Sequence, residues 1–302
     1  DKKSVKDIAK LINLQHINVK CIISKTIFNI LKMICEEYLL AKDELTQEQI
    51  EKLIKYDESP NKLHYSCIHI YGPAGSGKTY VALHLICKKL INSNFTTKIL
   101  FICTKNAFAK FFARWLLIRI LSGKDYSEEK QYDPKIILNC IHFCTNDIGY
   151  APHKVELKNN RDLDFVKVEQ NIDAYDWVVI DEAHHILRQN NTTWRNCYRK
   201  HFFTCKEKRV ILEDVSQDSS SQQAIKDKME EAVKDDKDNS EKGGENYEIY
   251  KINLVDVVRS TERITLASLP FRNPNSEIPT CKNNSFGKQI KVKMLDPNVS
   301  DM

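Results

Sequence analysis

The stretch Tyr71-Gly72-Pro73-Ala74-Gly75-Ser76-Gly77-Lys78-Thr79 determines the fold that we expect of this chain. It follows an apolar run, residues 67–71, and opens a helix-patterned run, residues 80–90. Three of the chain's eight glycines lie in this short segment, which disfavours a chance match in a glycine-rich loop. The pattern therefore predicts a tight loop between a buried strand and a helix.

Phosphate binding explains the spacing of this loop. A polyphosphate needs several backbone N–H groups turned inward at once, and the glycines allow that curvature and close approach. Lys78 is expected to reach the β- and γ-phosphates, the Thr79 hydroxyl to ligate Mg²⁺, and the following helix to add its positive dipole end. The residues expected to hold the nucleotide are Gly72, Pro73, Ala74, Gly75, Ser76, Gly77, Lys78, Thr79 and Tyr80.

A second segment supplies carboxylates. Residues 177–180 are continuously apolar and bounded by charge, which indicates a fully buried parallel strand. Asp181 and Glu182 follow at its carboxyl end, where open α/β sheets bind their ligands. Asp181 is expected to hold Mg²⁺ through water, and Glu182 to orient or deprotonate the attacking water. The alternative is a solvated acidic turn after a strand, which the upstream loop disfavours.

Together the two segments resemble the nucleotide site of P-loop ATPases of the helicase type, and Asp181-Glu182-Ala183-His184 is similar to a helicase second motif. Further matches between Gln49 and Ile264, in the right order, resemble superfamily 1 helicases, most of all the helicase-like part of Schlafen-type proteins. The resemblance implies ATP and Mg²⁺ as cofactors. Together with alternating buried and helical runs, it implies an α/β fold: a RecA-like P-loop NTPase with a central parallel sheet flanked by helices, plus an N-terminal helical segment.

An adenine-reading glutamine precedes the phosphate loop in that superfamily. Gln49 stands at the similar position here, and Gln47 is the weaker alternative. Gln49 is also the third helical position after Thr46, which fits a capping box. The two roles are compatible, because a capping box would fix the helix that presents the glutamine.

Two later segments resemble the third and fourth motifs of the superfamily. In the first, Asp214 would support a loop whose Gln217 senses the γ-phosphate, although Glu213 stands where many relatives carry glycine. In the second, Arg259 would reach the γ-phosphate; a solvated helix face is the alternative for this arginine. The resemblance thus implies Lys78, Glu182, Gln217 and Arg259 as catalytic residues, and Thr79 and Asp181 as metal ligands.

Single-stranded DNA or RNA is the partner that the resemblance implies. Thr104, Lys105 and Asn106 follow a buried strand whose end contacts the nucleic-acid backbone in superfamily 1, and an ordinary polar turn is the alternative. Residues 135–145 are expected to form another strand whose end lines the same groove. The formal charge of +5 allows such a groove without demonstrating one. The aromatic residues of the next helix, at helical spacing, are expected to face the core.

The chain is expected to divide into four parts. Residues 1–44 form a helical accessory segment, and residues 45–217 the RecA-like P-loop core. Residues 218–248 are charged and poor in apolar side chains, which predicts a mobile insertion. Residues 249–302 carry the fourth motif and a loosely packed tail, as the start of a second RecA-like domain that the chain lacks.

We therefore expect a nucleic-acid-dependent ATPase motor domain, slow without the arginine that a second domain contributes. The alternative is a nucleotide-gated switch or scaffold in which nucleic acid plays no part, and a nucleotide or metabolite kinase fits the later motifs less well. The ten cysteines show no zinc-finger spacing and are expected to be reduced, several of them inside buried strands. No apolar run approaches the length of a membrane span, so we expect no membrane contact and a location in the cytoplasm or nucleus.

Overall fold

The computed structural model describes residues 45–122, 132–149, 151–158, 163–168, 174–188, 200–202, 204–214, 248–258 and 280–281. The helices are α3 (Gln47–Asp57), α4 (Lys78–Asn92), α5 (Asn106–Leu121), α6 (Pro134–Cys140) and α7 (Ala183–Arg188), with a 3-10 turn η2 (Asn146–Ile148). The strands are β1 (Tyr65–Tyr71), β2 (Ile99–Ile102), β3 (Ile141–Cys144), β4 (His153–Leu157), β5 (Leu163–Lys167), β6 (Trp177–Ile180), β7 (Lys208–Glu213), β8 (Glu248–Asn253), β9 (Asp256–Val257) and β10 (Thr280–Cys281).

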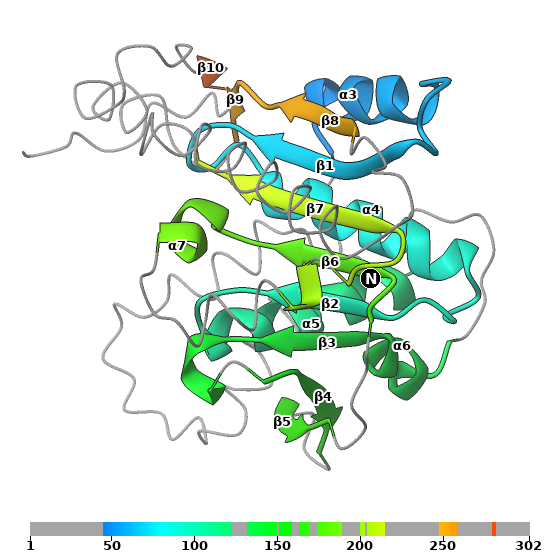
Figure 1. Cartoon of the computed structure of the whole chain (residues 1–302), viewed down its shortest axis with the longest axis vertical. Helices are drawn as coiled ribbons and strands as arrows, with labels where there is room; N and C mark the ends of the chain where they lie inside the picture. Colours follow the sequence, from blue (N-terminus) through cyan, green and yellow to red (C-terminus); the bar gives the residue numbers. More distant parts are fainter. Residues whose placement is uncertain are drawn as a thin grey trace, which may run out of the picture. The chain divides into compact units, whose positions relative to one another are not determined.

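Eight of these strands form one sheet, in the order β5-β4-β3-β2-β6-β7-β1-β8, which runs from bottom to top in Figure 1. The strands from β3 to β8 in this order pair in parallel, whereas β4 pairs antiparallel with both β3 and β5. The expected α/β class with a central, largely parallel sheet is confirmed. The antiparallel pair is an addition; β4 has a half-buried pattern, as antiparallel strands with a solvated face often do.

The prediction of a strand over residues 135–145 is wrong for most of that range. Residues 134–140 form α6, and only Ile141–Cys144 form β3. Asp133 caps this helix by accepting a hydrogen bond from the Lys135 N–H, and Pro134 stands at the start of the helix, where its missing N–H costs nothing. These two residues begin a helix before an apolar run that would otherwise extend as a strand.

The part that follows the charged region differs from the expected division. β8 pairs in parallel with β1 along the same sheet, so residues 248–253 belong to the core rather than to the start of another domain. The proposed accessory segment, 1–44, and nearly all of the proposed insertion, 218–248, lie outside the described residues.

The core lies on both faces of the sheet. On α5, Phe112 and Trp115 are buried, as the aromatic pattern predicted, and Phe112 stacks on Phe101 of β2 with ring centroids 4.1 Å apart. The prediction is wrong for Phe111 of the same helix, which is 41% exposed. On the opposite face, Cys67 and Cys144 lie in a buried cluster with residues of α7. Within the described ranges, no helix has the length and apolarity to cross a bilayer.

The parallel strands all end at one edge of the sheet. The segments that follow them are 72–79 after β1, 103–106 after β2, 145–147 after β3, 181–182 after β6, 214 after β7 and 254–258 after β8. Every described residue for which the sequence predicts a role at the ends of the strands therefore lies along this carboxyl edge. Such edges are where ligands bind in open parallel sheets.

Candidate nucleotide site

The loop between β1 and α4 has the backbone that the glycine spacing predicts. Gly75 and Gly77 have φ angles of 80° and 84°, which glycine adopts without strain. A Cβ on Gly77 would lie 2.4 Å from Nε2 of Gln49, so the site also excludes a side chain sterically. Gly77 caps α4 in the left-handed conformation, and the N-terminus of the helix begins at Lys78.

Lys78 lies inside this loop. Its side chain is buried, and its ammonium donates hydrogen bonds to the carbonyls of Gly72 at 2.8 Å and Pro73 at 2.9 Å. The hydroxyl of Ser76 is also buried and has no hydrogen-bond partner among the described residues. Buried polar groups normally have partners, and phosphate oxygens would supply one here. The loop therefore fits a polyphosphate on its own geometry.

Asp181 lies beside the first helical turn. The Thr79 hydroxyl donates to its Oδ1 at 3.4 Å, across 102 residues of sequence. Burial, and secondly the neighbouring Glu182, raise the pKa of Asp181 to about 7, while Lys78 opposes that rise. A buried carboxylate beside a second carboxylate and a hydroxyl offers the oxygen ligands that Mg²⁺ prefers. These two side chains fit the metal that the sequence predicts at this place.

Glu182 has an unusual backbone conformation. Its φ angle of 52° is in the left-handed region, which a residue other than glycine adopts at a cost of about 1–3 kcal/mol. The carbonyl of Glu182 accepts the N–H groups of His185 and Ile186, so the turn is held by the start of α7. Strained residues of this kind concentrate at functional sites, which agrees with the role predicted for Glu182.

Gln49 links helix α3 to the phosphate loop. The predicted capping box is present: Gln49 N donates to Thr46 Oγ1, and Gln49 Oε1 accepts from Thr46 N. The amide nitrogen of the same side chain donates to the carbonyl of Ser76 at 2.9 Å, and the residue is 2% exposed. Gln47, the weaker alternative, is exposed and bonds to Glu51 on its own helix. Gln49 is thus the glutamine that contacts the loop.

The two later motifs meet the loop from β7 and β8. Asp214 is buried at the end of β7. Glu213 is fully buried as well, and its Oε2 lies 2.8 Å from Nε2 of His69 on β1. The N–H of Val258 donates to the carbonyl of Gly75 at 3.0 Å, so the chain reaches the loop directly before position 259. Gln217 and Arg259 themselves lie outside the described residues.

The predicted nucleic-acid residues lie further along the same edge. The Thr145 hydroxyl donates to Oδ1 of Asn106 at 2.5 Å, and the Asn106 N–H donates to Asp147 at 2.9 Å. The Lys105 side chain is mostly exposed, and its Nζ lies 3.7 Å from Oδ1 of Asp147. The structure therefore brings the ends of β2 and β3 together, as the sequence predicted, with Thr104 half-buried beside them.

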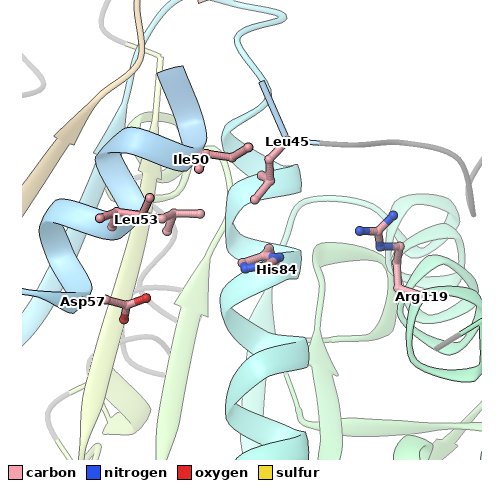
Figure 2. A pocket seen from close by; sticks show the side chains of 7 residues that line it. Leu45, Ile50, Leu53, Asp57, His84 and Arg119 are labelled. Atoms are coloured by element: carbon pink, nitrogen blue, oxygen red, sulfur yellow. The ribbon is translucent and has the colours of Figure 1, made fainter. Parts of the chain in front are cut away.

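A cavity of about 390 Å³ lies beside α4 but apart from the loop. Figure 2 shows Leu45, Ile50 and Leu53 on one side of it, with His84 of α4 next to them. No residue of the phosphate loop lines it, and neither Asp181 nor Glu182 does. The cavity is thus not the predicted phosphate site.

Sequence reasoning missed two contacts of this site. The His69–Glu213 pair joins β1 to β7, and the two residues are 144 positions apart in the sequence. The Glu48 carboxylate accepts the N–H groups of Val255 and Asp256, more than 200 residues away. An acidic residue in the first turn of a helix was visible in the sequence, but it indicates only a favourable helix dipole interaction.

The chain was compared with curated proteins, solved structures and protein families. A search among curated proteins found no significant match. Among solved structures, the chain is similar to a hypothetical ATP-dependent RNA helicase from Sulfolobus tokodaii, with 14% identity and a TM-score of 0.37; the match covers 78% of this chain and 58% of that one. The chain thus spans less than two thirds of that protein's length. Residues 42–213 match the family described as "Type III restriction enzyme, res subunit".

This family match spans more than half of the chain and contains the loop, the acidic pair and seven of the sheet's eight strands, β1 to β7. The chain therefore belongs to the family of the type III restriction enzyme res subunit, and it contains a helicase-like, RecA-type motor domain.

Proposed function

We propose that this chain binds ATP with Mg²⁺ at the loop of residues 72–79 and hydrolyses it, as the motor domain of a nucleic-acid-dependent ATPase. One observation carries the proposal: Thr79 and Asp181, from separate motifs, lie in hydrogen-bond contact beside the buried Lys78. Neither motif alone distinguishes a hydrolase from a binding protein. Their meeting at one edge of the sheet supplies both the phosphate cradle and the carboxylates that hydrolysis requires.

The residues have separate roles in this proposal. Lys78 binds the β- and γ-phosphates, and the loop N–H groups and the N-terminus of α4 stabilise their charge. Thr79 and Asp181 hold Mg²⁺, which when bound neutralises charge developing on the phosphates. Glu182 orients or deprotonates the attacking water. Gln49, fixed by its capping box, reads the adenine edge.

The later motifs complete the proposed site. Gln217 senses the γ-phosphate, and Arg259 contacts it; the bond from Val258 N to Gly75 O supports this role, because position 259 follows directly. An arginine from a second RecA-like domain would add about 10³ to 10⁵ in rate, so turnover by this chain alone is expected to be slow. Such a motor would work in the cytoplasm or nucleus.

Single-stranded DNA or RNA is the proposed activator. The described ends of β2 and β3 are polar, with an exposed lysine beside a threonine and an asparagine. A nucleotide-gated protein switch would instead be served by an apolar docking patch at these ends. The polar character therefore supports backbone contacts to nucleic acid, which need only hydrogen-bond donors.

The test is ATP hydrolysis by the purified chain with and without single-stranded DNA or RNA. We expect stimulation that both Lys78→Ala and Glu182→Gln abolish. Glu182→Gln should lose about 10² to 10⁴ in kcat, as is typical of a general base, while nucleotide affinity is retained. Nucleotide binding without stimulation by either nucleic acid would contradict the motor and favour the switch.

A further inference from the structure

Glu48, in the first turn of helix α3, accepts hydrogen bonds from residues more than 200 positions away in the chain. Its two carboxylate oxygens accept one backbone N–H each from consecutive residues, Val255 at 2.9 Å and Asp256 at 3.0 Å. Hydrogen bonds to an ionised carboxylate are about twice as strong as neutral ones. The first turn of α3 therefore holds the segment that follows β8.

That segment, residues 254–258, lies against the phosphate loop. Leu254 N donates to the carbonyl of Tyr71 at 2.8 Å, and Val258 N donates to the carbonyl of Gly75 at 3.0 Å. The packing is close enough that a Cβ on Gly72 would lie 2.2 Å from the carbonyl oxygen of Leu254. This segment, called the 254–258 wall below, is thus hydrogen-bonded to Tyr71 just before the loop and to Gly75 within the loop.

The neighbouring side chain of the same helical turn holds the loop itself. Gln49 donates to the carbonyl of Ser76 at 2.9 Å, one residue beyond the Gly75 carbonyl that Val258 contacts. Adjacent residues of α3 therefore bind the phosphate loop and the wall that supports it. A glycine-rich loop loses much conformational freedom when it is ordered, so contacts that order it beforehand favour ligand binding.

We propose that Glu48 is a positioning residue for the nucleotide site: by anchoring residues 255 and 256, it holds the 254–258 wall against the phosphate loop and keeps the loop in its phosphate-binding shape. This inference rests on the proposed function for its effect on nucleotide binding, but not for its effect on the wall. Loss of the anchor should loosen the wall first and the loop through it. The capping box of α3, which does not use Glu48, should keep the helix intact.

The test compares Glu48→Ala and Glu48→Gln with Glu51→Ala. Glu51 is the matched control, because it is an exposed carboxylate on the same helix, bonded to Gln47. With a fluorescent ATP analogue and Mg²⁺, we expect Glu48→Ala to raise Kd about tenfold. Glu48→Gln should fall between Glu48→Ala and the wild type, because its carboxamide keeps one acceptor oxygen. Glu51→Ala should change Kd less than about twofold.

Hydrogen exchange separates this inference from the proposed function. The Val258 amide bonds to Gly75, not to Glu48, so faster exchange there in Glu48→Ala would show that the wall leaves the loop. This readout does not require that nucleotide binds. Unchanged exchange at Val258 together with unchanged Kd would overturn the inference. If the wild-type chain bound no nucleotide, the proposed function would fail while exchange still decided the role of Glu48.

A purely structural role for Glu48 predicts a different result. It would lower the midpoint of urea unfolding and leave the nucleotide KM of the folded protein unchanged, which contradicts the inference. Positioning predicts a raised KM with little change in kcat in the folded protein, together with any lowering of the unfolding midpoint that the loss of two hydrogen bonds causes. If Glu48→Ala does not fold, the same comparison is made with Glu48→Gln, where a KM equal to the wild type would count against positioning.

Discussion

The carboxyl edge of the sheet has two halves that are built differently. In the phosphate half, formed by residues after β1, β6, β7 and β8, the loop is bonded to α3 and to the 254–258 wall. Its key side chains are buried: Lys78 is 8% exposed, Asp181 6% and Asp214 2%. In the outer half, formed by residues after β2 and β3, Thr145 is buried, but Asp147 is exposed and the Lys105 side chain is 69% exposed.

This difference fits the ligands that we propose for the two halves. A polyphosphate with its metal presents one fixed arrangement of charge, and a site ordered before binding stabilises it best. A nucleic-acid backbone is flexible and is bound through separate phosphates, so exposed donors suffice. The contrast can be tested by making the same change in each half.

The largest expected effect on stability and nucleotide binding comes from an alanine substitution, compared at two glycines that have the same backbone conformation. Gly77 lies in the phosphate half with φ 84°, and Gly149 follows the outer half with φ 74°. Alanine in this conformation costs about 1–2 kcal/mol at either site. At Gly77, the new Cβ would also meet the amide nitrogen of Gln49 at 2.4 Å, whereas nothing lies within 4 Å at Gly149.

We therefore expect Gly77→Ala to destabilise the protein by about 2–4 kcal/mol, with overpacking added to strain, and to abolish nucleotide binding. Gly149→Ala should cost about 1–2 kcal/mol and leave nucleotide affinity unchanged. Urea unfolding and nucleotide titration measure both. Equal losses of affinity in the two variants would show that the halves do not differ in this way.

The second prediction concerns the stability of the fold at acid pH. As the pH falls, His142 in the outer half lowers this stability, whereas Asp181 in the phosphate half raises it. His142 lies buried on β3, beneath the outer half, with Nδ1 3.0 Å from the Tyr175 hydroxyl. Burial, and then Lys98 and Lys154, lower the pKa of His142 to about 4. Between pH 6.5 and 4, the unfolded chain takes up a proton that the folded protein does not, so stability falls as the pH falls. Asp181, whose pKa burial raises, has the reverse effect.

We expect His142 to remove about 2 kcal/mol of stability between pH 7.5 and pH 5.0. His142→Gln keeps an acceptor for the Tyr175 hydroxyl but does not titrate. The wild type should therefore lose about 2 kcal/mol more than this variant over that range, measured by urea unfolding at both pH values. An identical pH dependence in the two proteins would show that His142 does not make this half acid-sensitive.

The same contrast shows what could be predicted from the sequence. The phosphate loop and the acidic pair are local patterns, since each function needs particular residues at fixed spacing, and the structure places Thr79 and Asp181 in contact. The Asn106–Thr145 bond follows from strand ends meeting at one edge. The capping box was also predictable, because it spans four residues.

Other features depend on partners far apart in the chain and leave no local pattern. Glu48 reaches residues 207 and 208 positions away, and the pairing of β8 with β1 joins the two ends of the described core. α6 was missed because its short apolar run satisfies a strand as well as a helix, and only Asp133 and Pro134 distinguish the two. Tertiary contacts decided the position of β8 and the role of Glu48, which cannot be read from one segment, whereas the start of α6 is marked locally by Asp133 and Pro134.

The smallest predicted effect tests the outer half directly. If Lys105 contacts a phosphate of single-stranded nucleic acid, Lys105→Ala should weaken binding by a similar few-fold factor for every sequence and reduce the slope of log affinity against log salt by about 0.7. Lys110→Ala is the control, because Lys110 is bonded to Asp164 on β5 and lies over the ring of Phe165. A fluorescence titration at several salt concentrations measures the slope for each variant. An unchanged slope in Lys105→Ala would mean that its ammonium is occupied by Asp147, 3.7 Å away, and that the outer half does not bind the backbone through this residue.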